Sequence, residues 1–329
     1  IAEARARLPH LVKSLLDCGV RPRLITRMTS RLSDTIVERL LALAMKELGP
    51  APARFCFVGL GSEGREELTL TTDQDNAIIY EDLPETDRPQ AEKYFLQLGE
   101  KVCTWLAQVG YPLCKGDIMA RNPKWNQPLT TWKYYFRDWI VKANPQDLLE
   151  FNVFFDFRCV CGDSGLTQEL RTAIQSLMND CPAFFLHMAQ NVLLYKPPLG
   201  FFGQIVAESG QAAQHAINIK DATLPIVNFA RLYALRHRVE ETHTPARLQR
   251  LCDLQVLKKS LYEELIEAYS LLMELRLNHQ VQTLVEGRAA NNSIELESLT
   301  HLQESLLKQA FSLISTIHKK TSFDFLGAA

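Results

Sequence analysis

Two carboxylates stand one residue apart, a short distance after a glycine-rich stretch. Residues 59–64 read GLGSEG, and Asp73 and Asp75 follow with a single glutamine between them. On a strand, side chains two residues apart point to the same face, so these like charges would repel each other unless a cation lay between them. Close carboxylates suit Mg²⁺, which can bind substrate phosphate oxygens at the same time. We therefore predict that Asp73 and Asp75 hold Mg²⁺ with the triphosphate of a nucleotide, and that two ions bind when the nucleotide is present.

A third carboxylate is expected from Asp156. It lies in the run 152–161 among phenylalanines, where an unpaired buried charge would be costly. We predict that this run is a strand with Phe154, Asp156 and Arg158 on one face. In that position Asp156 would complete the metal site and accept the proton of an attacking hydroxyl.

The glycine-rich stretch is predicted to form the phosphate side of the same site. Gly61 would allow close approach of the backbone, Ser62 would offer a hydrogen-bond donor, and Arg65 would add a charged contact to phosphate. Arg65 and Glu67 would also form an ion pair that braces the loop. A solvated helix start explains these charges about as well. The stretch also matches G-x-G-x-x-G, but it leads into a strand and no G-K-[ST] follows. Neither a dinucleotide fingerprint nor a Walker loop is therefore indicated.

The periodicity of apolar residues predicts an α+β fold in three segments. Helical spacing covers residues 1–49, a small mixed sheet with helices covers 50–195, and a C-terminal helical bundle covers 196–329. A chain of 329 residues is expected to form more than one domain. The predicted strands of the middle segment are 55–58, 75–80, 111–114 and 152–161, its clearest helix is 90–109, and a hairpin is predicted between 201–206 and 216–219.

Composition limits the class of protein. The net charge is −2, so no general attraction to nucleic acid is expected. No apolar stretch approaches the ~20 residues of a membrane span, and the N-terminal residues lack the apolar core of a signal peptide. The eight cysteines form no C-x-x-C pair, which favours reduced thiols over a zinc knuckle. We expect a cytoplasmic protein that binds neither membrane nor nucleic acid.

These motifs resemble the nucleotidyltransferase superfold shared with DNA polymerase beta, in which a Gly-Ser pair is followed by D-x-D. The segment 61–75 is similar to the glycine-rich segment of the PII-protein uridylyltransferases, and Asp156-Phe157-Arg158 resembles the D-x-R of glutamine-synthetase adenylyltransferases. A similarity to the DUF294 nucleotidyltransferases covers nearly the whole chain after residue 50. It includes MARN at 119–122 with Trp125, and LRLNHQ at 275–280 in the C-terminal helical domain.

The resemblance implies roles for residues that spacing does not single out. Asn122 would line a nucleoside pocket, although packing explains it equally well. Lys220 stands where related folds often place a basic residue near the β and γ phosphates, and a surface charge is the alternative. The family favours a small residue where Asp117 stands, so no role is assigned to that carboxylate.

The resemblance implies a nucleotidyltransferase that moves a nucleoside monophosphate from an NTP to an acceptor hydroxyl on a protein, as the PII uridylyltransferases do. This activity would depend on Mg²⁺ and serve regulation or signal transduction. The alternative is a catalytically silent module that binds nucleotides. The chain begins with Ile1, so we expect it to be part of a longer protein with upstream CBS or cyclic-nucleotide-binding sensor domains. Homodimerisation through the helical bundle is a further expectation.

Overall fold

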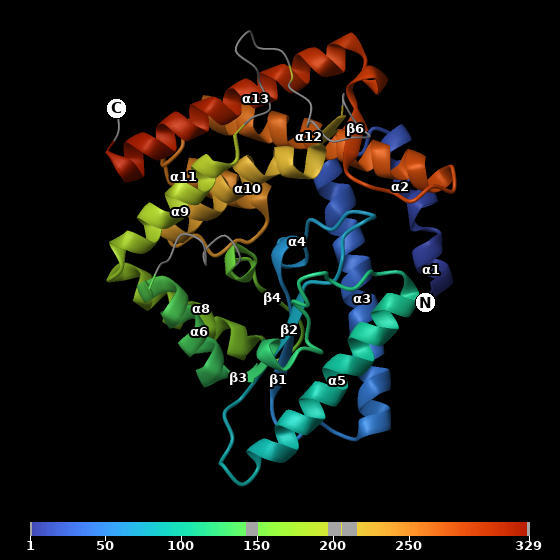
Figure 1. Cartoon of the computed structure of the whole chain (residues 1–329), viewed down its shortest axis with the longest axis vertical. Coiled ribbons are helices and arrows are strands. Elements are labelled where there is room, and N and C mark those ends of the chain that lie inside the picture. The colour runs from blue at the N-terminus through green and yellow to red at the C-terminus, as the bar shows by residue number, and fades with distance from the viewer. Residues whose placement is uncertain (1, 143–150, 197–204, 206–215, 328–329) are drawn as a thin grey trace. The chain divides into compact units, whose positions relative to one another are not determined.

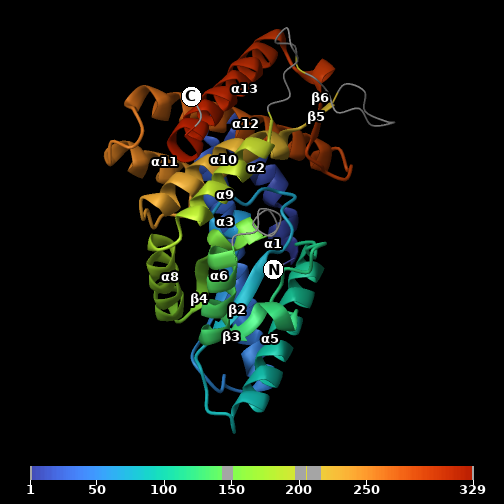
Figure 2. The same ribbon diagram turned by 60° about the vertical axis from the view of Figure 1, so that its left-hand side comes forward.

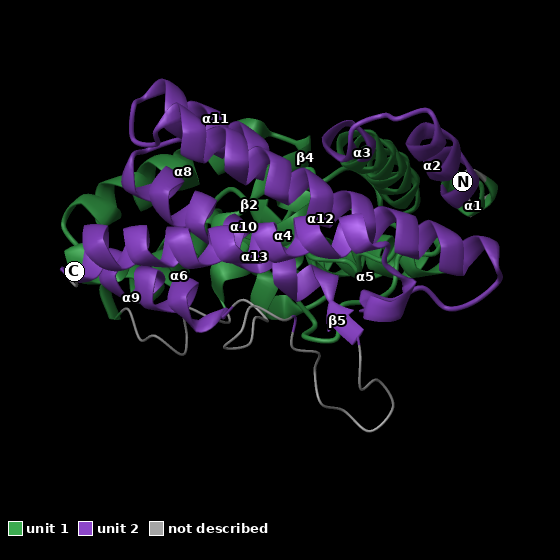
Figure 3. Ribbon diagram, turned by 90° about the horizontal axis from the view of Figure 1, so that it is seen from above, with its two compact units in different colours: residues 1–8, 26–184 green, residues 9–25, 185–329 purple. Residues whose placement is uncertain are grey.

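The structure is a computed structural model that describes residues 2–142, 151–196, 205 and 216–327 (Figure 1). The chain forms two compact units, coloured separately in Figure 3: residues 1–8 and 26–184 make unit 1, and residues 9–25 and 185–329 make unit 2. The α+β class is confirmed, with a small mixed sheet and helices at both ends of the chain. The division at residues 49/50 and 195/196 stays a prediction about where the chain separates into domains.

Unit 1 is built on a four-stranded sheet of order β3-β2-β1-β4. The central strand β1 pairs antiparallel with β2 and β4, and β2 pairs parallel with β3. The register of β1 against β4 shifts between Phe57 and Val58, which marks a β-bulge. The bulge lies just before Gly59, where β1 ends and the glycine-rich stretch 59–64 begins. The strands are β1 (Phe55–Gly59), β2 (Asn76–Tyr80), β3 (Asn126–Pro128) and β4 (Arg158–Gly162).

Both faces of the sheet are buried, which explains the unbroken apolar run of β1. Phe55 and Phe57 belong to the core formed with α3 and α5. Val58 points to the opposite face, where it meets Trp132 of α6 and Leu170 of α8. Figure 2 shows α5 along one side of the sheet. The helices of unit 1 are α1 (Ala2–Ala6), α3 (Pro22–Leu48), α4 (Gly61–Gly64), α5 (Arg88–Val109), η1 (Pro123–Trp125), α6 (Leu129–Lys142), η2 (Asn152–Phe155) and α8 (Ser164–Asn179).

Two predicted strands are wrong in part or entirely. The segment 111–114 is a loop, and the short strand β3 lies further along the chain. The run 152–161 begins as the 3₁₀ turn η2 and becomes a strand only at Arg158. Alternation fails there because Phe154 and Phe155 are consecutive and both buried, Phe154 against Trp125 and Phe155 against Phe136.

Unit 2 is mainly helical, as predicted for the C-terminal segment. Its strand β5 (Ala216–Asn218) pairs antiparallel with β6 (Ser293–Glu295). The predicted hairpin partner of 216–219 falls almost wholly outside the described residues, and β6 is the partner that the structure shows. The remaining elements are α2 (Leu8–Asp17), α9 (Pro182–Leu194), α10 (Ile219–Arg236), α11 (Thr244–Asp253), α12 (Lys259–Val285), η3 (Leu296–Ser298), α13 (His301–Thr321) and the π-helical turn η4 (Ser322–Leu326).

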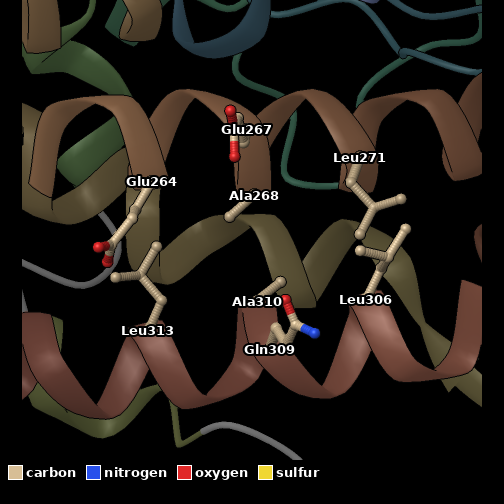
Figure 4. A pocket seen from close by; sticks show the side chains of 8 residues that line it. All are labelled: Glu264, Glu267, Ala268, Leu271, Leu306, Gln309, Ala310 and Leu313. Carbon is tan, nitrogen blue, oxygen red and sulfur yellow. The ribbon is translucent and has the colours of Figure 1, made fainter. Parts of the chain in front are cut away.

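A shallow groove of about 340 Å³ runs between α12 and α13 in unit 2. Figure 4 shows Ala268 facing Ala310 at its centre and Leu271 beside Leu306 at one end. The two alanines leave room because their side chains end at Cβ. Every helix in the described ranges is too short or too polar for a transmembrane span.

Candidate functional site

Asp73 and Asp75 lie in the loop that precedes β2, one step before the strand that was predicted to carry them. They still point the same way because Gln74 between them is buried and turned inward. Its Nε2 donates to the carbonyl oxygens of Cys103 at 3.0 Å and Tyr111 at 2.9 Å. The side chains of Asp73 and Asp75 are half-buried, and their carboxylate oxygens lie within 4.8 Å of each other and of the Cys114 sulfur.

Cys114 is a member of this group that the sequence reasoning missed. Main-chain hydrogen bonds join the loop that carries Cys114 to the loop that carries Asp73 and Asp75. The Gln74 N–H donates to Pro112 O at 2.9 Å, and the Asn76 N–H donates to Ile118 O at 3.1 Å. Burial and the negative charge of Asp75 raise the pKa of the Cys114 thiol to about 11. The sequence held no signal for this position of Cys114, because the segment predicted as a strand over 111–114 is a loop that approaches the aspartates only in the folded chain.

The glycine-rich stretch 59–64, called the glycine loop from here on, packs directly against the loop that carries Asp73 and Asp75. Gly61 has φ +53, and a Cβ there would lie 2.6 Å from Val153 Cγ2 and 3.5 Å from Asp75 Oδ2. Only glycine adopts this conformation at little cost, and any side chain here would collide with Val153. The Leu60 N–H donates to Asp75 O at 2.8 Å, which fixes the two loops to each other. The structure therefore brings Gly61 beside Asp75, and phosphate binding by Gly61 and Ser62 stays a prediction.

Gly64 joins the same loop to Asp156. A Cβ on Gly64 would lie 1.8 Å from the carbonyl oxygen of Asp156, a distance that no side chain could tolerate. Both residues are buried, and the carboxylate of Asp156 is fully inaccessible. This close approach sets the end of α4 against the turn that leads into β4.

The side chain of Arg65 is buried and forms ion pairs, so it joins the glycine loop to Asp156 instead of being exposed to a phosphate. Its Nη1 donates to Asp156 Oδ2 at 2.7 Å, its Nε donates to Glu67 Oε2 at 2.7 Å, and its Nη2 donates to Ser62 Oγ at 3.3 Å. Burial alone would lower the pKa of Arg65, but the two carboxylates outweigh it and raise that pKa. The bracing ion pair with Glu67 is thus present, and phosphate contact by Arg65 stays a prediction.

Asp156 does not lie in mid-strand. It follows η2, two residues before β4 begins, and its φ of −109 and ψ of 63 belong to neither helix nor strand. Among the described residues, the acidic group with metal-binding spacing holds Asp73 and Asp75 but does not include Asp156. The third carboxylate of the prediction is instead neutralised by Arg65, and its role as a metal ligand and base stays a prediction.

A second buried charge network lies behind the glycine loop. Arg158 donates through Nη2 and Nη1 to Asp34 of α3 at 2.8 and 3.0 Å, and also through Nη2 to the carbonyl oxygen of Glu63 at 3.2 Å. Burial raises the pKa of the Glu63 carboxyl to about 8. Arg158 opposes this shift, and the charges of Asp34 and Asp75 add to it. Helix α3 thus supports the loop that carries the predicted phosphate contacts.

Asn122 has a local structural role in this structure. Its Oδ1 accepts from the Lys124 N–H at 3.0 Å, which caps η1, and its Nδ2 donates to Asp117 O at 3.1 Å. Asp117 has φ +50, a left-handed conformation that glycine adopts more easily, which explains why a small residue is expected there. A contact of Asn122 with a nucleoside stays a prediction.

Lys220 belongs to the other unit. It is exposed in the first turn of α10, where the Asn218 side chain caps the helix by accepting from the main-chain N–H groups of Lys220 at 3.1 Å and Asp221 at 3.4 Å. A contact of its ammonium group with phosphate stays a prediction.

The N-terminal and C-terminal halves of the chain match separate protein families. Residues 6–146 match the family described as "Putative nucleotidyltransferase DUF294". Residues 182–325 match the family described as "Putative nucleotidyltransferase substrate binding domain".

Curated relatives of the chain are named as adenylyltransferases, which are also nucleotidyltransferases. The chain is 29% identical over 162 residues to a bifunctional glutamine synthetase adenylyltransferase/adenylyl-removing enzyme of Bifidobacterium longum strain DJO10A, and 29% identical over 160 residues to that of strain NCC 2705. These alignments cover 44% and 43% of this chain but only 14% of each relative. The chain therefore spans a small part of the length of the relatives that it matches.

Proposed function

The chain belongs to the DUF294 family of nucleotidyltransferases, and from this we propose that it transfers a nucleoside monophosphate from an NTP to a hydroxyl group of a protein in a Mg²⁺-dependent reaction with a regulatory role. The observation that carries the proposal is the contact between the glycine loop and the aspartates. The backbone of Gly61 lies beside Asp75 Oδ2, so a phosphate group bound by the glycine loop and a cation held by Asp75 would be neighbours. The protein acceptor is proposed by analogy with the relatives, whose names specify adenylyl transfer to glutamine synthetase.

The donor set fits a divalent cation. Two half-buried carboxylates converge from one loop, and the neighbouring Gly61 has no side chain of its own beside them. Asp73 and Asp75 would hold Mg²⁺, which when bound would neutralise the triphosphate and lower the pKa of the acceptor hydroxyl. Gly61 and Ser62 begin α4, and the first N–H groups of a helix have no partner within it, so they can bind phosphate oxygens.

Asp156 is proposed as the third carboxylate and as the group that takes the proton of the acceptor hydroxyl. In this structure it is buried beneath Arg65, so the proposed role requires the guanidinium of Arg65 to move toward the phosphates as the nucleotide binds. The phosphate contact of Arg65 and the release of Asp156 would then be one event. Phosphate would replace the carboxylate as the partner of the guanidinium.

The buried ion pair between Arg65 and Asp156 also favours a second candidate function. If this pair persists when nucleotide binds, the site keeps two carboxylates for metal and lacks a base. The chain would then be a regulatory module that binds NTP without transferring its nucleotidyl group.

Incubation with Mg²⁺ and each α-labelled NTP, with and without cell extract, separates the two functions. Nucleotidyl transfer predicts label on a protein band together with release of pyrophosphate, and loss of at least about 10²-fold in rate in Asp75→Asn with an unchanged circular dichroism spectrum. Glu264→Gln, a groove residue in unit 2, is the matched control and should keep the label. NTP binding without label would support the regulatory module, and an undiminished rate in Asp75→Asn would exclude the assigned metal site.

A further inference from the structure

Cys114 places a sulfur atom in a group that otherwise offers only oxygen. Its Sγ and the carboxylate oxygens of Asp73 and Asp75 all lie within 4.8 Å of one another. These three residues come from two separate loops, which main-chain hydrogen bonds hold side by side. The thiol is half-buried, and its Sγ lies within 4.8 Å of a carboxylate oxygen of each aspartate, so it faces the predicted cation position.

Sulfur changes the choice of cation. Mg²⁺ takes oxygen ligands in octahedral geometry, whereas thiolate favours Zn²⁺ and related thiophilic ions. Bond lengths of about 2.3 Å to sulfur and about 2.0–2.2 Å to oxygen put the ligand atoms of a tetrahedral zinc site roughly 3.3–3.7 Å apart. The group would need only small side-chain rotations to reach this spacing. Three protein ligands with an open fourth position are typical of zinc sites that also bind water or substrate.

We propose that Asp73, Asp75 and Cys114 together bind a thiophilic divalent cation of the Zn²⁺ class, and that this ion excludes Mg²⁺ from the same two carboxylates. The proposal rests on the proposed function only in taking Asp73 and Asp75 as cation ligands. It adds a regulatory consequence, because a thiophilic ion at this position would stop Mg²⁺-supported transfer. The sulfur would bind as thiolate, and its proton would pass to solvent.

Cd²⁺ is the probe for this site, since a cadmium–thiolate bond absorbs in the near ultraviolet. Titration of the reduced full chain with Cd²⁺ should produce this band, and a tenfold excess of Mg²⁺ should leave it in place. The Cys114→Ser and Asp75→Asn variants should lose the band or bind Cd²⁺ at least about tenfold more weakly. The Cys181→Ser variant is the matched control, because Cys181 is also a free, half-buried thiol, and it should behave as wild type.

A band that survives in Cys114→Ser, that is absent in wild type, or that a tenfold excess of Mg²⁺ removes would overturn the proposal. Circular dichroism of each variant shows whether it is folded, and Zn²⁺ competition against Cd²⁺ provides a readout for the natural ion. Transfer with Mg²⁺ is measured separately on the wild-type chain. A cadmium band without transfer would retain this inference and reject the proposed function, whereas transfer without a cadmium band would do the reverse.

Discussion

Glu63 is a carboxylic acid that the fold keeps away from water. Its side chain is 6% exposed, and it lies over Gly59, where a Cβ would come within 2.7 Å of Glu63 Cγ. Its pKa is raised from 4.5 to about 8, so the group is mostly protonated near neutral pH in the folded chain and ionised in the unfolded chain. Stability therefore falls as pH rises from about 4.5 to 8, because the unfolded state has already lost the proton that the folded state retains.

Replacing Glu63 with Gln should remove this dependence on pH. The expected gain in the free energy of unfolding is of the order of 4 kcal/mol at pH 8.5 relative to the difference at pH 5, because the pKa is raised from 4.5 to about 8. Urea unfolding of both proteins across this pH range measures it. If the free energy of unfolding depends on pH in the same way in both proteins, the pKa of Glu63 is not raised in the folded state.

At the scale of the element, α4 and the loop around it are fixed by buried charge. Arg65 is 8% exposed and faces Glu67 at 3% and Asp156 at 0%. Because these groups have little access to water, the two carboxylates depend on the guanidinium for neutralisation. The same arrangement makes Arg65 a positioning residue for the glycine loop even before any nucleotide binds.

Arg65→Met should therefore destabilise unit 1 by about 3–5 kcal/mol, since it removes the buried positive charge that faces both carboxylates. Arg121→Met is the matched control: its partner Asp117 is half-exposed, and the expected cost is about 0–1 kcal/mol. Chemical denaturation followed by tryptophan fluorescence reports the change. Equal effects of the two substitutions would mean that the Arg65 pairs contribute no more than a surface pair.

The elements differ in how well periodicity predicts them. Strand β1 and helix α5 follow directly from an apolar run and from helical spacing that ends at Gly110, whose φ is +106. The segment before Asp156 was mispredicted because alternation in sequence cannot reveal that two adjacent phenylalanines pack against different aromatic neighbours. The proximity of Asp73 and Asp75 was predictable from spacing two apart. The contributions of Cys114 and of the Arg65 ion pairs were not, because they depend on contacts between loops.

At the scale of the whole molecule, the N-terminal helices do not form one segment. Residues 9–25 belong to unit 2, and the rest of α3 belongs to unit 1. Leu16 and Val20 line the same cavity, of about 500 Å³, as Tyr262 and Ile266 of α12. The predicted connecting segment 1–49 therefore supplies part of the packing of both units.

Val12 tests this assignment because it is fully buried while its neighbour Leu11 is 47% exposed. Val12→Ala should lower stability by about 1–2 kcal/mol and raise amide hydrogen exchange in α12 of unit 2, with little change in β2 of unit 1. Leu11→Ala should change neither. Faster exchange in β2 than in α12 would place α2 with the sheet instead.

The split of the N-terminal residues also sets an order of events during synthesis. About 160 residues separate Ile25 from Phe185, where the chain returns to unit 2. At translation rates of roughly 5–20 residues per second, α2 emerges from the ribosome about 12–48 s before α12, which begins about 240 residues after α2 ends. Unit 1 can fold in that interval, but the apolar face of α2 must wait. The nascent chain thus presents a hydrophobic helix to chaperones for as long as its partners remain untranslated.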